Sequence, residues 1–366
     1  MHVSVDKQRL SEAIGLMVRV VGKKESLPVL SCILLEARKG ELVLRATNLE
    51  SGVEVHLPAK VDTGGVCAVP ALILAQTVRT LRTTQVSFEH EDKKLTCRSG
   101  ASTTTIHTIP HEEFPTIPIP TAGARFTLPR GMFLDGVRSV AYAASVSTIR
   151  QEFASIFLTY KDGAVVFAAT DSFRLAEKKI HTTVKKQPED VLIPVKNALD
   201  MAHVFEGGAD EEIICTIVDS QLHAVLGPVS FVSRVVDASF PSYEAIIPKK
   251  TTTEATLLKA DLAAVLQKAV IFSGDARQIG FHIYPKKKIF TAAAQHNSIG
   301  EMADAVDAAI SGEDIDINFN VPFIIDCLQS INTDSVVMKF AGNGKPLTLE
   351  GVSDKTFMYL VMPLNR

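Results

Sequence analysis

The sequence predicts an α+β fold made of three similar domains, each with two helices and antiparallel sheets. Two kinds of segment recur three times: a short strand followed by a polar cap and an amphipathic helix, and a strand followed by proline and a second helix. Between the helices, apolar and polar residues alternate, which is typical of antiparallel strands. Together these patterns indicate one α+β unit repeated three times.

The first helix of each repeat follows a strand directly. The three segments are VSVDKQRLSEAIGLM from Val3, FTLPRGMFLDGVRSV from Phe126 and ATLLKADLAAVLQKAV from Ala255, at intervals of 123 and 129 residues. Asp6 is expected to cap the first of these helices, because its carboxylate can accept from the free N–H groups of the first turn.

The second helix of each repeat starts at a proline. The segments are VCAVPALILAQTVRTL around Pro70, VLIPVKNALDMAHVF around Pro194 and INFNVPFIIDCLQSI around Pro322, at intervals of 124 and 128 residues. Proline is tolerated at the first helical position, because the N–H that it lacks would have no partner there. The two markers therefore agree on one period.

The strands lie between these helices. Alternating stretches such as ELVLRATNLESGVEVHL and KLTCRSGASTTTIHTI bring each repeat to about eight strands. Turn and linker residues in PIPTAGA (118–124) and PKKTTTE (248–254) indicate the boundaries. The predicted domains are 1–122, 123–249 and 250–366.

Length and composition favour a folded, soluble chain. The 366 residues suit two or three domains, and 46% of them are hydrophobic. No apolar run approaches the roughly 18 residues that span a bilayer, and no signal peptide opens the sequence. We therefore expect a cytoplasmic protein with no membrane partner.

The cysteines are scattered and form no CxxC pair, so buried reduced thiols are expected. They are Cys32, Cys67, Cys97, Cys215 and Cys327.

The motifs GxSxG, HExxH and GxGxxG, typical of serine hydrolases, zinc proteases and dinucleotide-binding folds, are missing. AGNGKP (341–346) lacks the first glycine and the final Ser or Thr of a phosphate loop, and DIDINFN (314–320) lacks the glycine of a calcium loop. We expect no catalytic residue, metal site or cofactor. One enzymatic alternative stays open, in which Asp171, in the 170–175 turn, acts as acid or base.

Charge is distributed unevenly between the helices and the rest of the chain. The predicted helices, with the short loops that follow some of them, contain 14 Lys and Arg against 7 Asp and Glu, a net +7, although the whole chain carries −3. Either helices simply favour basic residues, or they share a surface that faces polyphosphate. The second explanation makes nucleic acid a candidate partner, for example one bound by these helices in a groove-type DNA-binding protein.

At this point the sequence resembles a known family, the bacterial DNA polymerase III beta subunit, or beta sliding clamp. The resemblance runs across essentially the whole chain. The segments that carry it are LPVLSCILLEARKGELVLRATNLESGVEV (27–55), ATDSFRLA (169–176), VVDASFPSYEAIIP (235–248), FNVPFIIDCL (319–328) and YLVMPLNR (359–366).

The resemblance implies a noncatalytic processivity factor for DNA replication. Two chains would form a head-to-tail homodimer, in which six clamp-type domains close a ring with the helices inside. Twelve helices packed at about 9 to 10 Å leave an opening of roughly 24 to 28 Å, wide enough for duplex DNA. Sequence-independent attraction to phosphates would permit sliding. The implied protein partners are the DNA polymerase III alpha subunit, the clamp loader and other proteins with clamp-binding motifs.

The resemblance also implies a cleft between the second and third domains, where partners insert a short peptide that begins with glutamine and ends in apolar or aromatic residues. Carried over by position, the cleft residues are Phe153, Thr170, Ser172, Phe173, Arg174, Leu175, Pro241, Ile246, Asn320, Phe323, Leu360 and Met362.

Two cleft positions depart from the family pattern. Relatives usually have glycine where Ser172 stands, and a side chain there disfavours a positive φ. They have histidine or tyrosine where Phe173 stands, and phenylalanine cannot offer the same hydrogen bond. We expect the cleft to persist with a changed peptide preference.

Further residues carried over from the family would face DNA or join the two chains. Lys24, Arg150 and Lys196 are expected to face DNA, whereas relatives often carry basic side chains where this chain has Leu72 and Ile73. In the dimer, the resemblance implies that Ile271 and Phe272 meet Ile106, beside an exposed strand edge at TTTIHTI (103–109).

Overall fold

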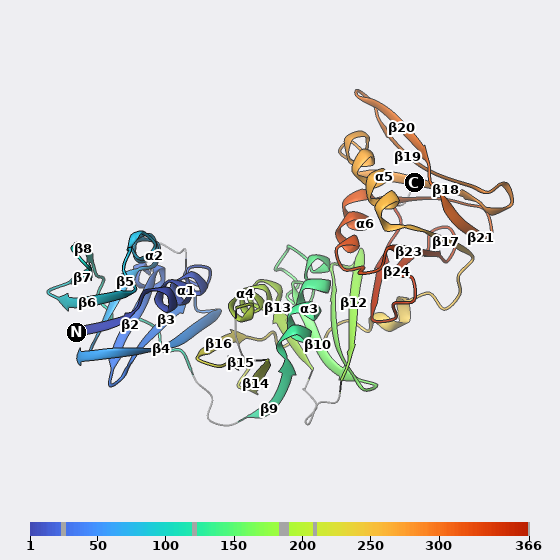
Figure 1. Ribbon diagram of the computed structural model, residues 1–366. Coiled ribbons are helices and arrows are strands. Elements are labelled where there is room, and N and C mark those ends of the chain that lie inside the picture. Colours follow the sequence, from blue (N-terminus) through green and yellow to red (C-terminus); the bar gives the residue numbers. More distant parts are fainter. Residues whose placement is uncertain (23–26, 119–122, 183–189, 208–210, 365–366) are drawn as a thin grey trace. The chain divides into compact units, whose positions relative to one another are not determined.

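The computed structural model describes residues 1–22, 27–118, 123–182, 190–207 and 211–364. Their contacts divide the chain into two compact units: Met1–Leu134 with Lys196–Val235 form the first unit, and the remaining described residues form the second. Figure 1 shows the elements of both units. In these described ranges, no helix is long and apolar enough to cross a membrane.

The order of elements repeats three times, which confirms the predicted α+β repeat. The first repeat comprises β1 (His2–Asp6), α1 (Lys7–Met17), β2 (Cys32–Arg38), β3 (Glu41–Thr47), β4 (Ser51–Thr63), β5 (Gly65–Pro70), α2 (Ala71–Thr80), β6 (Gln85–Glu91), β7 (Lys94–Ser99) and β8 (Ser102–His107). The second comprises β9 (Ala124–Pro129), α3 (Arg130–Val140), β10 (Ser155–Lys161), β11 (Ala164–Thr170), β12 (Arg174–His181), β13 (Val191–Pro194), α4 (Val195–Phe205), β14 (Glu212–Val218), β15 (Gln221–Leu226) and β16 (Val229–Arg234). The third comprises β17 (Thr253–Leu258), α5 (Lys259–Phe272), β18 (Gln278–Tyr284), β19 (Ile289–His296), β20 (Gly300–Ala305), β21 (Ala308–Gly312), β22 (Ile315–Asn320), α6 (Val321–Leu328), β23 (Ser335–Phe340), β24 (Leu347–Gly351) and β25 (Phe357–Val361).

A capping side chain and three prolines mark where helices begin. Asp6 caps α1 as predicted, and its carboxylate accepts from the Arg9 N–H over 2.9 Å. Pro70 and Pro194 are the last residues of β5 and β13, one position earlier than predicted, whereas Pro322 lies within the first turn of α6. Pro70 combines φ −53° with an extended ψ of 119°, so one residue can end a strand and lead into a helix.

The helix α1 packs an apolar stripe against the strands. In α1 the buried residues follow helical spacing, and α1 contacts both α2 and the strands β1, β3 and β4. The helices α5 and α6 also lie against each other (Figure 1). The buried residues of α1 are Leu10, Ala13, Ile14 and Met17.

Two sheets continue from one repeat into the next, and this is why the contacts form two units. In the first unit, nine strands of a twelve-stranded sheet follow the order β8-β7-β6-β1-β4-β16-β15-β14-β9, and β4 pairs with β16 of the second repeat. The other three strands branch from β4 in the order β3-β2-β5. In the second unit a nine-stranded sheet follows the order β13-β10-β11-β12-β25-β24-β23-β17-β21, and β12 pairs with β25 of the third repeat.

Two strands at sheet ends complete this scheme. The second unit contains a four-stranded sheet in the order β20-β19-β18-β22, which ends at β20, and the twelve-stranded sheet ends at β8. In the repeated order of elements, β20 corresponds to β4 and β12, and β8 corresponds to β16 and β25. Among the described residues, β20 and β8 are therefore the strands at these equivalent positions that pair with no strand of another repeat.

The core is apolar and tightly packed. All seven residues of β11 are buried, and Gly136 of α3 lies so close that a Cβ atom there would be 2.3 Å from the Phe167 ring. The five cysteines are buried and free, as predicted, and burial raises the pKa of Cys97 to about 12. These thiols therefore stay protonated and serve as core side chains.

Candidate partner-docking cleft

The chain reverses direction between β11 and β12 in a five-residue turn from Thr170 to Arg174, which we call the Thr170 turn. Thr170 Oγ1 donates to the Arg174 carbonyl over 2.6 Å and accepts from the Ser172 N–H over 3.2 Å. Asp171 Oδ1 accepts from the N–H groups of Phe173 and Arg174, both over 2.9 Å. Two side chains thus satisfy the backbone groups of this turn.

Ser172 adopts a φ of +80°, although a side chain disfavours that conformation. The hydrogen bonds of Thr170 and Asp171 hold the residues around it, so the turn keeps the shape that glycine would adopt most easily. Serine at this position, where the family pattern has glycine, therefore costs about 1 kcal/mol of conformational energy. The backbone of the turn keeps its path.

Arg174 joins the turn to α6. Its Nε donates to Asp171 over 3.0 Å, its Nη1 donates to Asp326 over 2.6 Å, and its guanidinium carbon lies 4.4 Å from the centre of the Phe323 ring. Burial works against the charge of Arg174, but its hydrogen bond to Asp326 and its interactions with Tyr359 and Asp171 outweigh burial and raise its pKa. The arginine therefore fixes Phe323 and the turn relative to each other.

Asp171 is fully engaged in holding the turn. Its carboxylate accepts from two backbone N–H groups and from the Arg174 side chain. This geometry supports a structural role, and it gives no support to the alternative in which Asp171 is an acid or base.

The other wall of the predicted cleft is expected from β25 and the residues after it. Leu360 pairs with Leu175, and the Met362 N–H donates to the Phe173 carbonyl over 2.8 Å. The Tyr359 hydroxyl donates to the Phe323 carbonyl over 2.7 Å, and burial raises the pKa of Tyr359 well above its ordinary value, so the donor proton is kept.

The predicted cleft residues divide into a buried floor and an exposed mouth. Leu175 and Leu360 are buried in one apolar cluster with Ala168 and Tyr243, and Met362 packs against it. Phe173, in contrast, is 63% exposed, and Ile246 is also exposed. An exposed apolar mouth over an apolar floor is typical of a peptide-binding surface.

The remaining predicted residues are less uniform. Asn320 caps α6 through its side-chain oxygen, which accepts from the Phe323 N–H. Phe153 lies beneath the Arg150 guanidinium, 4.1 Å from its carbon to the ring centre. Pro241 lines a cavity of about 410 Å³, which is bordered by Phe157, Phe240 and Tyr243.

Sequence reasoning missed Asp326 and Tyr243. Asp326 follows Phe323 by three residues on α6, so helical spacing could have indicated that both reach the same neighbour. Tyr243 is buried, and its hydroxyl donates to Glu177 over 2.5 Å. No local pattern indicates that partner, because Glu177 lies on a distant strand.

Two of the three cations expected to face DNA can be placed, whereas Lys24 lies outside the described residues. Lys196 is exposed on α4, 3.5 Å from Asp200, whose pKa is raised by burial. Arg150 pairs with Glu152 over 2.9 Å in addition to its contact with Phe153. Arg150 is therefore linked to a predicted cleft residue.

The residues expected at the dimer contact behave differently from one another. Ile271 is 60% exposed at the end of α5, and the Phe272 ring lies near Gly300 at the start of β20. Ile106 is 5% exposed within its own chain, so little of its side chain is free, and its contact with the partner stays a prediction. What β8 offers at the end of its sheet is its backbone edge.

Family comparisons cover almost the whole chain. Models of the DNA polymerase III beta subunit match three successive segments: the N-terminal domain at residues 1–118, the central domain at 127–242 and the C-terminal domain at 244–365.

Curated and solved proteins agree with these matches. The chain is 26% identical to the beta sliding clamp of Synechococcus elongatus, covering 98% of this chain and 97% of the relative, and 23% identical to that of Escherichia coli over the full length of both. The DNA polymerase III beta subunit of Thermotoga maritima matches with a TM-score of 0.94 and 24% identity, covering 100% of this chain and 99% of that one. A sliding clamp from Pseudomonas aeruginosa, bound to griselimycin, matches with a TM-score of 0.93 and 23% identity over 100% of both chains.

Proposed function

Because the chain belongs to the DNA polymerase III beta subunit family, we propose that two copies close head to tail into a ring that encircles duplex DNA. The protein is a sliding clamp, a noncatalytic subunit that acts as a processivity factor in DNA replication. As such it works in the bacterial cytoplasm, where the chromosome lies.

The observation that carries the ring is the series of joints between repeats. β4 pairs with β16, and β12 pairs with β25, each time joining one repeat to the next. The strands that correspond to them, β20 and β8, both end their sheets. Pairing β20 of one copy with β8 of the other would extend the series, and two such joints would close a ring of six repeats.

Apolar side chains beside β20 support this joint. Ile271 is exposed on the last turn of α5, and Phe272 lies against the start of β20. We propose that these two residues cover the β8 edge of the partner, with the backbone of β8 supplying the hydrogen bonds.

Inside the ring, we propose that Lys24, Arg150 and Lys196 attract phosphates without reading bases. Contacts of this kind hold a duplex at any sequence, so the ring can move along it.

At the cleft, we propose that the DNA polymerase III alpha subunit, the clamp loader and other partners dock short peptides on Phe173, Ile246 and Met362. Burying two or three apolar anchors of about 150 Å² each is worth roughly 7 to 11 kcal/mol, and ordering the peptide costs about 2 to 5. The difference corresponds to micromolar binding or weaker, so partners can exchange.

The test is retention on DNA in high salt. The protein is loaded onto nicked circular and linear duplexes with a compatible clamp loader and ATP, and then separated from free protein by gel filtration. A ring stays on the circle and leaves the linear DNA by its ends. A groove-binding protein would leave both forms as salt rises, and that outcome would overturn the proposal.

A further inference from the structure

The turn between β3 and β4, from Thr47 to Ser51, repeats the Thr170 turn bond for bond; we call it the Thr47 turn. Thr47 Oγ1 donates to the Ser51 carbonyl over 2.8 Å and accepts from the Leu49 N–H over 3.1 Å. Asn48 Oδ1 accepts from the N–H groups of Glu50 and Ser51 over 2.9 and 2.8 Å. Leu49 adopts a φ of +76°, close to the +80° of Ser172.

The strand beside each turn is also equivalent. Ser51 pairs with Ser233 as Arg174 pairs with Val361. The Arg234 N–H then donates to the Glu50 carbonyl over 3.0 Å, as the Met362 N–H donates to Phe173. The Thr47 turn is therefore a second copy of the backbone frame that surrounds the docking cleft.

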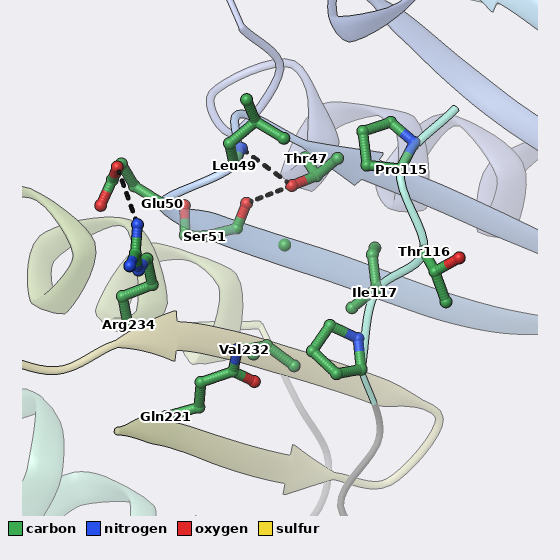
Figure 2. A pocket seen from close by; sticks show the side chains of 12 residues that line it. Thr47, Leu49, Glu50, Ser51, Pro115, Thr116, Ile117, Gln221, Val232 and Arg234 are labelled. Carbon is green, nitrogen blue, oxygen red and sulfur yellow. Dashed lines mark hydrogen bonds and ion pairs between the residues drawn. The ribbon is translucent and has the colours of Figure 1, made fainter. Parts of the chain in front are cut away.

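This second frame borders an open cavity of about 320 Å³ (Figure 2). Its volume falls in the range of roughly 300 to 1,000 Å³ that is usual for ligand sites. Apolar side chains from three segments line it: Leu49 from the turn, Val232 from β16, and Ile117 from the segment that follows the first repeat. A Cβ atom at Gly52 would lie 3.1 Å from Ile117, so the glycine leaves room for this side chain.

The mouth of this cavity differs from that of the docking cleft. Glu50 stands where the Thr170 turn has Phe173, and Arg234 stands where β25 is followed by Met362. Their charged atoms are 3.7 Å apart, and the two side chains are 62% and 64% exposed. A pair this exposed is weak, so a ligand with suitable charges can replace it.

We propose that this cavity, which we call the Thr47 cleft, is a second docking site for short partner peptides, namely peptides with one aliphatic side chain between a basic and an acidic residue. The inference rests on the function proposed for the Thr170 turn, because it extends that use to a second copy of the same frame. The aliphatic side chain enters between Leu49, Ile117 and Val232. The basic residue pairs with Glu50 and the acidic residue with Arg234.

The experiment uses methyl NMR of the full-length protein, with labelled Ile, Leu, Val and Met methyl groups. The probes are the capped pentapeptides SKLES and SELKS, which carry the same charges in opposite order. Saturable shifts of the Leu49, Ile117 and Val232 methyl groups are expected, with one peptide binding more tightly than the other.

Charge reversal decides whether the cleft is responsible. In the double variant Glu50→Arg with Arg234→Glu, the preference is expected to reverse, with an affinity change of about tenfold for each peptide. The matched control is Phe173→Ala, which alters the docking cleft and is expected to leave both affinities unchanged. The proposal is overturned if neither peptide gives saturable shifts, or if the double variant keeps the original order.

A third peptide separates this inference from the function on which it rests. A capped pentapeptide that begins with glutamine and ends in leucine and phenylalanine is expected to shift the Met362 methyl group. If this peptide binds and the charged peptides do not, only the second site is refuted. If it also fails to bind, the proposed role of the Thr170 turn fails as well.

Discussion

The Thr47 turn and the Thr170 turn have the same backbone and opposite characters at the mouth. In each, a threonine and the residue after it, Asn48 or Asp171, bind the backbone groups. Two exposed side chains at equivalent positions take no part in this bonding, and they differ: Glu50 in the first turn is charged, and Phe173 in the second is apolar. The comparison indicates that a short capping pattern determines the turn, whereas recognition depends on positions that the turn leaves free.

The largest expected difference between the turns concerns Arg174, which occupies the position of Ser51. Replacing Arg174 with alanine leaves the carboxylates of Asp171 and Asp326 without their shared partner, and we expect a loss of about 3 kcal/mol in the free energy of unfolding. Ser51→Ala removes one hydroxyl with a 3.3 Å contact and is expected to cost about 0.5 kcal/mol. Urea unfolding of both variants measures the difference, and equal losses would contradict it.

Phe173 tests recognition without touching the backbone bonds. Phe173→Ala is expected to weaken binding of the glutamine-led peptide roughly 20-fold, since an exposed aromatic anchor is lost. Glu50→Ala, the matched change at the Thr47 turn, should leave that affinity unchanged. Isothermal titration calorimetry measures both, and a similar loss in the two variants would mean that the peptide does not choose between the clefts.

The shared capping bonds should have similar energies in both turns. Asn48→Ala and Asp171→Ala each remove the acceptor of two backbone N–H groups, and we expect each to cost about 1 to 2 kcal/mol in the free energy of unfolding. Asp171→Ala belongs at the upper end, because it also removes one partner of Arg174. An unchanged midpoint of urea unfolding for either variant would show that its cap does not hold the turn.

The smallest effect is expected at the residues with positive φ. Ser172→Gly relieves an unfavourable conformation but loosens the unfolded chain, so a net stabilisation of about 0.5 kcal/mol is expected. Leu49→Gly should gain less, because it also removes an apolar side chain from the cavity wall. Thermal unfolding midpoints rank the two, and a destabilised Ser172→Gly would show that the serine contributes more than its backbone conformation suggests.

The fold was largely accessible from the sequence because its markers are local. Asp6, the three prolines and the alternating strands each act within a few residues of the chain, so they indicate helices and strands directly. The period of the repeat followed from their spacing.

The site was less accessible because its geometry depends on distant partners. The positive φ of Ser172 is held by hydrogen bonds that override its own preference, and the pairing of Arg174 with Asp326 joins residues 152 positions apart. Ile106 shows another limit of the sequence, since an apolar residue on an edge strand can point into its own core. In β8, Ile106 is the buried residue, and the sequence of the strand does not say which neighbour covers it.

The joints between repeats have a mechanical consequence for the proposed ring. At β4 with β16 and at β12 with β25, the two strands belong to one chain, so separated strands stay tethered and can pair again without a collision between molecules. The joint between β20 and β8 of the other copy has no such tether. A ring built this way has two joints between chains, where force can open it, and four joints within chains, which resist opening. The lifetime of the closed ring is therefore set by the two joints between chains.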